Sequence, residues 1–546
     1  MTVWTKLGSA AGAIADDFAS FARLVGPRAG RAGLELEPGL RTYRIERYGG
    51  LTRIHLRVHP DKTGMLFVDV TDAVHLSETA VVMAHLALEN VAEAEAVARL
   101  LRRYRGVGRK QLRAHYRKLC QVIETLSDPR AGGCRSCLVD LPRQPLFSTR
   151  AKAPYKVDVA LTYACNNKCP HCYNDPDRFD LASLPTDEWK RVIDLLAEVG
   201  VPHLIFTGGE ATLHPGLPEL IAHADGYGQI TGLNSNGRRL THAPYMRELA
   251  DAGLDHVQVT LESHRADIHD AMVGARAFRQ TVKGIETALD AGLHVITNTT
   301  LTKASAPDAE ETVRFLHRLG LRTFAMNGMI YSGGGSGTPD AIPQEELPAL
   351  LVRVRDTAEE LGMRFLWYTV TEYCEMSPVE LEIGAKRCNA GEYSMCVEPN
   401  GDVLPCQSYY VSAGNVLRDP WEQIWKGELF RSFRDREDDP RAHGLPEKCW
   451  ECPDLPLCGG GCRIERELKD DPGGPAAGCQ SCASGGLRSS GRSALESVPG
   501  CSTASAPSAT GGGCASGACG CGTRGELIQI SSPSKKRPKA AEEPTP

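Results

Sequence analysis

Three cysteines lie close together in the stretch CNNKCPHCY, which covers residues 165–173. They are Cys165, Cys169 and Cys172, spaced Cys-x3-Cys-x2-Cys. A tetrahedral metal ion or a cubane iron–sulfur cluster takes four ligands. The stretch therefore supplies three thiolates and leaves one position for another ligand. A zinc ion completed by His171 is one way to fill that position.

A second group of cysteines follows much later in the chain. It contains seven in order: Cys388-x12-Gly401-x4-Cys406, then Cys449-x2-Cys452-x5-Cys458-x3-Cys462, then Cys479. Zinc knuckles would account for two cysteine pairs, but they do not need an ordered set of seven. The pattern therefore favours thiolate-bound clusters in this region.

Composition places this metal chemistry in a reducing compartment. The chain has 546 residues and 20 cysteines, and its first residues lack the apolar core of a secretory signal. Clustered cysteines in a long chain without a signal indicate metal binding rather than disulfides, and we expect a cytoplasmic protein. The net charge of −6 gives no basic surface for nucleic acid. No apolar run approaches the ~20 residues that span a membrane.

Residues 150–370 must position the first cysteines, and they alternate strand and helix patterns. Six strands are predicted, at 156–163, 203–210, 229–237, 256–263, 294–302 and 323–327. Such alternation predicts a parallel sheet, here an open, partial (β/α)6 barrel of the α/β class. The cysteine stretch follows the first strand and Gly208-Gly209-Glu210 ends the second, so both reach the barrel mouth where active sites form.

These two motifs resemble those of the radical S-adenosylmethionine (SAM) enzymes, and the resemblance covers residues 155–330. It implies that Cys165, Cys169 and Cys172 each bind one iron of a [4Fe–4S] cluster. The fourth iron would take the amino and carboxylate groups of SAM. Reductive cleavage of SAM would then give a 5′-deoxyadenosyl radical that abstracts hydrogen from unactivated C–H bonds.

The same resemblance implies roles for residues around SAM. Tyr173 would pack near the adenine and Glu210, after Gly208 and Gly209, would receive the amino group. Asn234 and Ser235 are candidates for the ribose side, although they also suit a plain turn. The chain departs from the family at Val273, where an Arg is frequent, so another group would have to hold the SAM carboxylate.

Residues 371–484 resemble the SPASM domain that follows the barrel in peptide-modifying radical SAM enzymes. The resemblance implies two auxiliary [4Fe–4S] clusters. The outer one would use Cys449, Cys452, Cys458 and Cys479, and the inner one Cys388, Cys406 and Cys462. Cys374 and Cys396 compete as the inner cluster's fourth ligand, an open iron is a third possibility, and Cys482 is an alternative to Cys479.

The hydrophobic pattern of residues 34–145 predicts a winged-helix-like α+β domain, in which three strands precede three helices. Gly49-Gly50 separates the first two strands, a hairpin signal. The pattern resembles the peptide-chaperone domain of pyrroloquinoline quinone biosynthesis, which implies binding of a leader peptide by strand addition. A purely structural winged helix is the alternative. Residues 1–33 predict a helix and linker, and Cys134 and Cys137 receive no role.

Together the motifs predict a radical SAM/SPASM maturase that crosslinks, epimerises or oxidises a ribosomally made peptide. It would depend on a flavodoxin-type or ferredoxin-type electron donor. A radical SAM enzyme acting on a small molecule and an iron–sulfur carrier are the alternatives. Residues 485–546 are rich in Gly, Ser and Ala and predict a disordered tail. Its Cys514, Cys519 and Cys521 belong either to an expendable extension or to a segment that delivers thiols.

Overall fold

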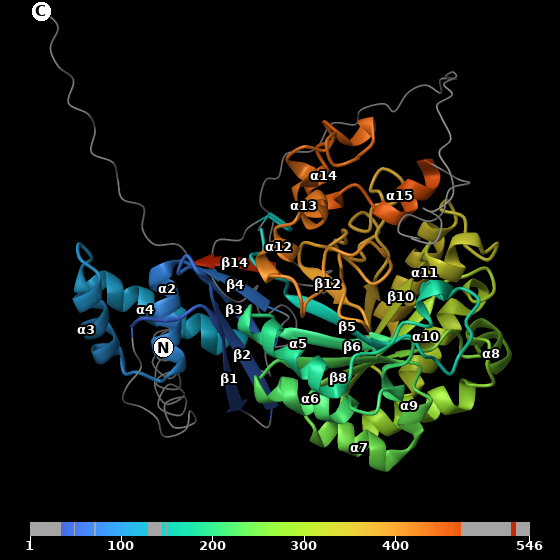
Figure 1. Cartoon of the computed structure of the whole chain (residues 1–546), viewed down its shortest axis with the longest axis horizontal. Helices are drawn as coiled ribbons and strands as arrows, with labels where there is room; N and C mark the ends of the chain where they lie inside the picture. The colour runs from blue at the N-terminus through green and yellow to red at the C-terminus, as the bar shows by residue number, and fades with distance from the viewer. Residues whose placement is uncertain are drawn as a thin grey trace, which may run out of the picture.

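The computed structural model describes residues 34–47, 50–69, 72–128, 145–148, 150–470 and 526–530 (Figure 1). The predicted helix in 1–33 lies outside these residues, as do Cys134, Cys137, Cys479, Cys482 and the three tail cysteines. The domain boundaries proposed from the sequence stay predictions. In the described part of the chain, no helix has the length and apolar character needed to cross a membrane.

The N-terminal domain is an antiparallel sheet followed by three helices. Its elements are β1 (Gly39–Arg47), β2 (Gly50–Val58), β3 (Gly64–Val68), β4 (Asp72–Leu76), α2 (Glu78–Leu88), α3 (Glu93–Arg103) and α4 (Arg109–Leu126). The predicted hairpin and helices are confirmed, but the prediction of three strands missed β4. Helix α2 begins after β4, because the Ser77 side chain accepts a hydrogen bond from the Ala80 amide and caps the helix.

Both faces of this sheet are buried. Ile54, Leu56 and Val58 of β2 pack against the three helices in one apolar core. The residues that alternate with them, Arg53, His55 and Arg57, face the next domain and are also buried. Such alternation commonly indicates a sheet with one buried and one solvent-exposed face. Here the second face is buried against the next domain instead.

The second domain is the predicted parallel sheet. The six expected strands are confirmed as β5 (Lys156–Thr162), β6 (His203–Gly208), β7 (Ile230–Ser235), β8 (His256–Thr260), β9 (His294–Thr300) and β10 (Thr323–Asn327). A seventh strand, β11 (Arg364–Trp367), pairs in parallel with β10. It has only four residues, too few to show a strand period in the sequence.

Helices connect the strands. They are α5 (Thr186–Glu198), α6 (Leu217–Gly226), α7 (Ala243–Asp251), α8 (Ala266–Val273), α9 (Phe278–Asp290), α10 (Ala309–Arg318) and α11 (Leu347–Glu360). The apolar stripe of α5 is buried, with Trp189 and Leu196 fully enclosed. Thr186 is the first helical residue, and Pro185 takes the cap position. Gly200 ends the helix with φ +86°, which favours glycine.

The third domain is mostly loop, as its composition indicates, and it lies over the barrel edge near β5 (Figure 1). Its strand β12 (Ser394–Val397) pairs in parallel with β5, and β13 (Val403–Leu404) pairs antiparallel with β12. Short helices follow: α12 (Trp421–Trp425), α13 (Glu428–Arg434), α14 (Leu455–Cys458) and α15 (Arg463–Asp470). Because β12 joins the barrel sheet, this domain is fixed directly to the strand that precedes Cys165.

One further strand, β14 (Glu526–Ile530), pairs in parallel with β4 of the N-terminal domain. The predicted disorder of residues 485–546 therefore does not hold for these five residues. Their run ELIQI contains Leu and two β-branched Ile residues, which suit a strand despite the Gly-rich and Ser-rich sequence around them.

Buried arginines join the N-terminal sheet to the barrel. Arg53 donates to the Gln229 carbonyl at 3.0 Å and pairs with Asp255 at 2.8 Å. Arg57 donates to the Ala153 and Pro154 carbonyls at 3.0 and 2.7 Å. These contacts give the terminal nitrogens of both buried cations acceptors on the barrel side of the interface and hold the two domains together.

Candidate active site

The Cys165–Cys172 loop follows β5 at the carboxyl end of the sheet. Lys168 donates its amide to the Val273 carbonyl at 3.0 Å, and Gly334 donates its amide to the Cys172 carbonyl at 2.8 Å. A Cβ on Gly334 would lie 2.2 Å from the Pro170 carbonyl oxygen, so only glycine permits this approach. The loop is thus held by backbone contacts from two distant segments, which leaves its cysteine side chains available.

Gly208 and Gly209 explain why the second motif contains glycines. The Gly209 amide donates to the Thr162 carbonyl at 2.7 Å, directly before the cysteine loop. A Cβ on Gly208 would lie 2.1 Å from the Thr162 carbonyl oxygen, and one on Gly209 would lie 2.3 Å from that of Tyr163. The motif therefore brings the end of β6 into backbone contact with the end of β5.

Glu210 is almost completely buried, with 1% of its surface exposed. Its Oε1 accepts hydrogen bonds from the hydroxyls of Ser235 at 2.8 Å and Thr212 at 2.7 Å. Its Oε2 accepts the Asn236 amide at 2.7 Å. The structure thus brings the predicted residues Glu210 and Ser235 together. Asn234 lies next to Ser235 on β7, opposite Gln258 of β8.

Two residues that sequence reasoning missed tie β7 to the cysteine loop. Asn236 donates from Nδ2 to the Asn166 side chain at 2.6 Å. Arg238 donates to the Asn167 side chain at 3.0 Å and to the Asn166 carbonyl. The signal was present in the stretch NSNGR, where polar residues follow a buried strand. Arg238 also brings a cation to the mouth of a barrel in which Val273 supplies none.

His171 is committed to a carboxylate. Its Nε2 lies 3.1 Å from Oε1 of Glu262, which is 1% exposed and whose Oε2 accepts the Thr300 amide at 2.7 Å. Burial lowers the pKa of His171, but the hydrogen bond and the charge of Glu262 outweigh it and raise the pKa overall. Within the described residues, no three His, Cys, Asp or Glu side chains converge on a site for one metal ion. His171 therefore directs Nε2 to Glu262 rather than to the cysteine loop.

A buried network joins the cysteine loop to the third domain. Glu398 accepts the Tyr163 hydroxyl at 3.0 Å and pairs with Arg178 at 2.9 Å, and its side chain is 0% exposed. Arg178 also donates to the Tyr410 carbonyl at 3.0 Å. The Tyr410 hydroxyl in turn donates to the carbonyl of Tyr173 at 2.9 Å. Tyr173 is thus anchored from the third domain.

Cys388, Cys406 and Cys462, predicted to share a cluster, pack around one apolar group that includes Tyr409 and Phe433. Burial raises the pKa of Cys406 to about 12 and that of Cys462 to about 11, with a further contribution from Cys388 to each. A recess beside Cys388 is lined by Arg436, Arg463 and Arg466. Thiolates next to cations suit an anionic iron–sulfur cluster.

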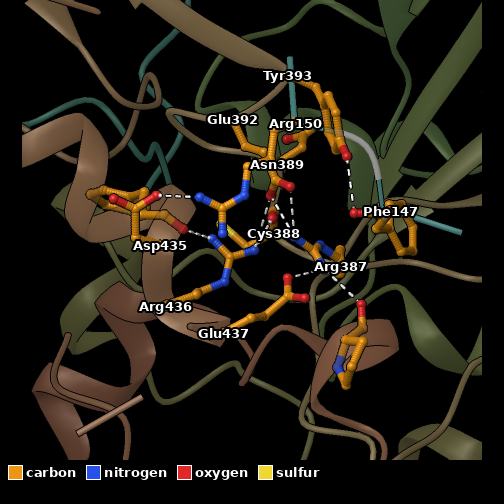
Figure 2. A network of polar contacts seen from close by, with 12 residues as sticks. Phe147, Arg150, Arg387, Cys388, Asn389, Glu392, Tyr393, Asp435, Arg436 and Glu437 are labelled. Atoms are coloured by element: carbon orange, nitrogen blue, oxygen red, sulfur yellow. Dashed lines mark hydrogen bonds and ion pairs between the residues drawn. The ribbon is translucent and has the colours of Figure 1, made fainter. Parts of the chain in front are cut away.

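An ion network fixes the backbone around Cys388 (Figure 2). Arg387 is fully buried and donates to both oxygens of Glu392 at 2.7 Å. Arg436 pairs with Glu392 at 3.3 Å and donates to the Cys388 carbonyl at 2.6 Å. Glu437 pairs with Arg387 as a second carboxylate. Two cations and two carboxylates therefore balance each other beside the predicted ligand.

Cys449, Cys452 and Cys458 lie in another part of the domain. Cys449 and Cys452 pack with Leu445 and Leu455, and burial raises the pKa of Cys449 to about 11. Gly459, Gly460 and Gly461 all have positive φ, at 68°, 74° and 74°. These left-handed backbone conformations favour glycine at all three positions between Cys458 and Cys462.

The two candidates for the inner cluster's fourth ligand lie apart. Cys396 is fully buried on β12 among Tyr163, Leu404 and Tyr410, and burial raises its pKa, with smaller contributions from Asp158, Glu398 and Cys406. Cys374 lies by Cys458, whose charge contributes to its raised pKa, and the neighbouring Tyr373 donates its amide to the Cys458 sulfur at 3.3 Å. Cys374 is therefore associated with the outer set.

Thiols at the barrel mouth are protonated until a metal binds. Burial raises the pKa of Cys165, Cys169 and Cys172, and the charges of Glu262 and the other two thiols add to the effect at Cys169. All cysteines that the structure describes are free thiols. Three thiol ligands supplied by one short loop suit a [4Fe–4S] cluster.

Comparison with known proteins agrees with this geometry. Residues 159–316 match the model of the radical SAM superfamily, and residues 388–453 match that of the SPASM iron–sulfur cluster-binding domain. The chain is 31% identical over 323 residues to a PqqA peptide cyclase of Methylocella silvestris, covering 56% of this chain and 81% of that relative. The chain belongs to the radical SAM superfamily.

Other relatives of this radical SAM protein carry different names. An AdoMet-dependent heme synthase of Nitratidesulfovibrio vulgaris is 28% identical over 328 residues, covering 56% of this chain and 85% of the relative. The crystal structure of Streptococcus suis SuiB bound to S-adenosylmethionine aligns with a TM-score of 0.57 at 17% identity, covering 77% of this chain and 96% of SuiB. That likeness confirms the three-domain fold.

The family membership identifies the cofactors. The radical SAM domain binds a [4Fe–4S] cluster and SAM, and the SPASM domain binds auxiliary iron–sulfur clusters. The protein is therefore an enzyme of SAM-dependent radical chemistry. The free thiols and the cationic recess by Cys388 fit these groups.

Proposed function

We propose that this radical SAM/SPASM enzyme modifies a ribosomally made peptide that its N-terminal domain captures by strand addition. The observation that carries the proposal is that edge strand β4 accepts a further strand, β14, along its whole length. An edge that pairs with one extended segment offers the same backbone donors and acceptors to a peptide. The relatives named PqqA peptide cyclase and mycofactocin maturase support a peptide substrate.

The proposed roles of the residues follow their positions. Cys165, Cys169 and Cys172 hold the cluster that binds SAM, and the bound cluster and SAM supply the hydrogen-abstracting chemistry. Tyr173, Glu210, Asn234 and Ser235 line the SAM side. Glu210 acts chiefly through Ser235 and Asn236, because its oxygens already accept their hydrogen bonds. Arg238, which donates to Asn166 and Asn167 of the cysteine loop, is our candidate to hold the SAM carboxylate in place of the family's Arg at Val273.

The auxiliary thiolates form two sets. We assign Cys388, Cys406 and Cys462 to an inner cluster, which their common apolar surroundings support. The outer cluster takes Cys449, Cys452, Cys458 and Cys479. Electrons come from a flavodoxin or ferredoxin in the cytoplasm. Three cubanes would give about twelve irons per chain, which anaerobic reconstitution and iron and sulfide counting can test.

One variant tests the SAM-binding cluster. Alanine at Cys165, Cys169 and Cys172 together should abolish formation of 5′-deoxyadenosine while iron in the SPASM domain remains. Continued SAM cleavage by this triple variant would refute the assignment. A matched control is Cys120→Ala, since this buried thiol packs among the N-terminal helices, away from all three sets.

The substrate class needs a separate experiment. The reduced enzyme and SAM are incubated with the peptide encoded by a short neighbouring reading frame, and the peptide mass is measured. A mass change that a scrambled leader abolishes supports peptide modification. The heme-synthase relatives favour a porphyrin-like small molecule as second candidate. SAM turnover stimulated by an iron porphyrin, but by no peptide, would replace our proposal with that one.

A further inference from the structure

The strand that β4 accepts comes from the far end of the same chain. In the register of this parallel pair, Glu526 is opposite Asp72, Ile528 is opposite Val74, and Ile530 is opposite Leu76. Figure 1 shows β14 next to β4 at the end of the N-terminal sheet. The topology thus brings residues more than four hundred positions apart into one ladder, and no helix or barrel segment intervenes in the strand order.

The rest of the sheet leaves little choice for a further strand. Val74 and Leu76 of β4 belong to the core beneath the helices, while Ala73 packs with Met65, Phe67 and Tyr155 on the opposite face. With both faces covered, a peptide can join this sheet only at an edge. At the β4 edge, the backbone groups that would pair with it already pair with β14.

We infer that residues Glu526–Ile530 are an intramolecular occupant of the peptide-binding edge, and that a substrate peptide binds there by displacing them. The inference rests on the proposed function and adds a regulatory element to it. The segment carries the residues needed for a strand, and Pro533, three positions beyond it, cannot donate to a ladder. A leader peptide can outcompete this segment where its side chains pair with β4 more favourably than those of ELIQI do.

Because β14 is covalently linked to the domain whose edge it occupies, it competes with any free peptide for that edge. Fifty-five residues separate Asp470 from Glu526, so the strand is present at one copy per edge at any protein concentration. Linked segments of this kind reach effective concentrations up to about millimolar. If the paired form outnumbers the open form by about ten to one, a free peptide binds about tenfold more weakly than to an open edge. The tail thereby selects for peptides that pair with β4 more strongly than ELIQI does.

The first experiment measures the pairing in the full-length protein. Successive residues of a strand direct their amides to opposite sides, so only one of Leu527 and Ile528 donates to β4. We make Leu527→Pro and Ile528→Pro, each the control for the other. Residue-resolved hydrogen exchange of Asp72–Leu76 should show protection in the wild type that one proline removes and the other largely keeps. The inference would be overturned if the amides of β4 that face β14 were unprotected in the wild type, or if both prolines had equal effects.

The second experiment measures displacement with a defined probe. A fluorescent decapeptide with the sequence of residues 523–532, TRGELIQISS, is titrated into the wild type and both proline variants. It should bind the disruptive variant at least tenfold more tightly than the wild type and the other variant. Equal affinity for all three proteins overturns the competition.

The two proposals can fail separately. If the decapeptide discriminates between the variants but no partner peptide is modified by any of them, the tail inference stands and the proposed peptide substrate fails. If a partner peptide is modified equally well by the wild type and the disruptive variant, with equal apparent affinity, the substrate class stands and the tail inference fails.

Discussion

Replacing Arg178 by methionine removes the cation that faces the buried Glu398 carboxylate. In the wild type Arg178 lies 2.9 Å from Oε2 of Glu398, whose side chain has no exposed surface. Burial raises the pKa of Glu398 and Arg178 opposes that rise. Without Arg178 the Glu398 carboxyl must take up a proton or remain an unpaired buried charge. The free energy of taking up the proton is the upper limit of the destabilisation, because the carboxyl protonates whenever remaining charged would cost more.

The magnitude follows from the proton uptake. A carboxyl of ordinary pKa about 4.3 is about 2.7 units below pH 7, and each unit is worth about 1.36 kcal/mol, which gives about 3.7 kcal/mol. Breaking a buried ion pair typically costs about 3–5 kcal/mol. The network holds the Tyr173 carbonyl through Tyr410, so we expect local opening of residues 163–175 to become up to about 500-fold more frequent.

Hydrogen exchange with mass spectrometry on anaerobic protein measures this opening. Because the folded pKa of Glu398 is raised further in the variant, the deficit should grow with pH, from about 1 kcal/mol at pH 5 to the full value at pH 7. The double variant with Glu398→Gln should recover part of the protection. Arg265→Met is the control, since its pair with Asp267 is 51% and 67% exposed and contributes little to stability. Equal loss at both pH values, or no recovery in the double variant, refutes the buried-charge explanation.

Three further predictions concern the interface, the auxiliary clusters and the second motif. Burial lowers the pKa of His55, whose ring bonds the Gly228 carbonyl, to about 4, so the stability of the N-terminal interface is complete above about pH 6.5 and falls by up to about 3 kcal/mol towards pH 4. The stability of His55→Gln, measured by thermal unfolding, should depend less on pH in that window. A pH dependence equal to that of the wild type contradicts the prediction. Cys374→Ser should alter the electron paramagnetic resonance signal of the outer auxiliary cluster and leave the inner one, and a change in the inner signal alone contradicts the association with Cys458. Gly209→Ala, which forces a Cβ to 2.3 Å from the Tyr163 carbonyl oxygen, should weaken SAM binding at least tenfold in equilibrium dialysis, whereas Gly226→Ala, with open space around it, should not.

Much of the fold and of the catalytic centre was available from local sequence. Six β/α units, the cysteine loop after the first strand and the glycines of the second motif are encoded by short-range patterns. Helix and strand periods set which side chains are buried. The motifs that resemble those of radical SAM enzymes and of the SPASM domain are also short and local, so the candidate ligands Cys165, Cys169, Cys172, Cys388 and Cys406 could be named from the sequence.

Contacts between distant segments were decided only by the tertiary structure. The pairing of His171 with Glu262 joins loops 91 positions apart. The same holds for the Glu398 network, for the place of Cys374 beside Cys458, and for β14 on the edge of β4. The physical reason is that a buried charge, or an unpaired strand edge, is stabilised by whichever partner the folded chain brings close. Sequence spacing does not contain that proximity, because it arises from packing three domains against one another.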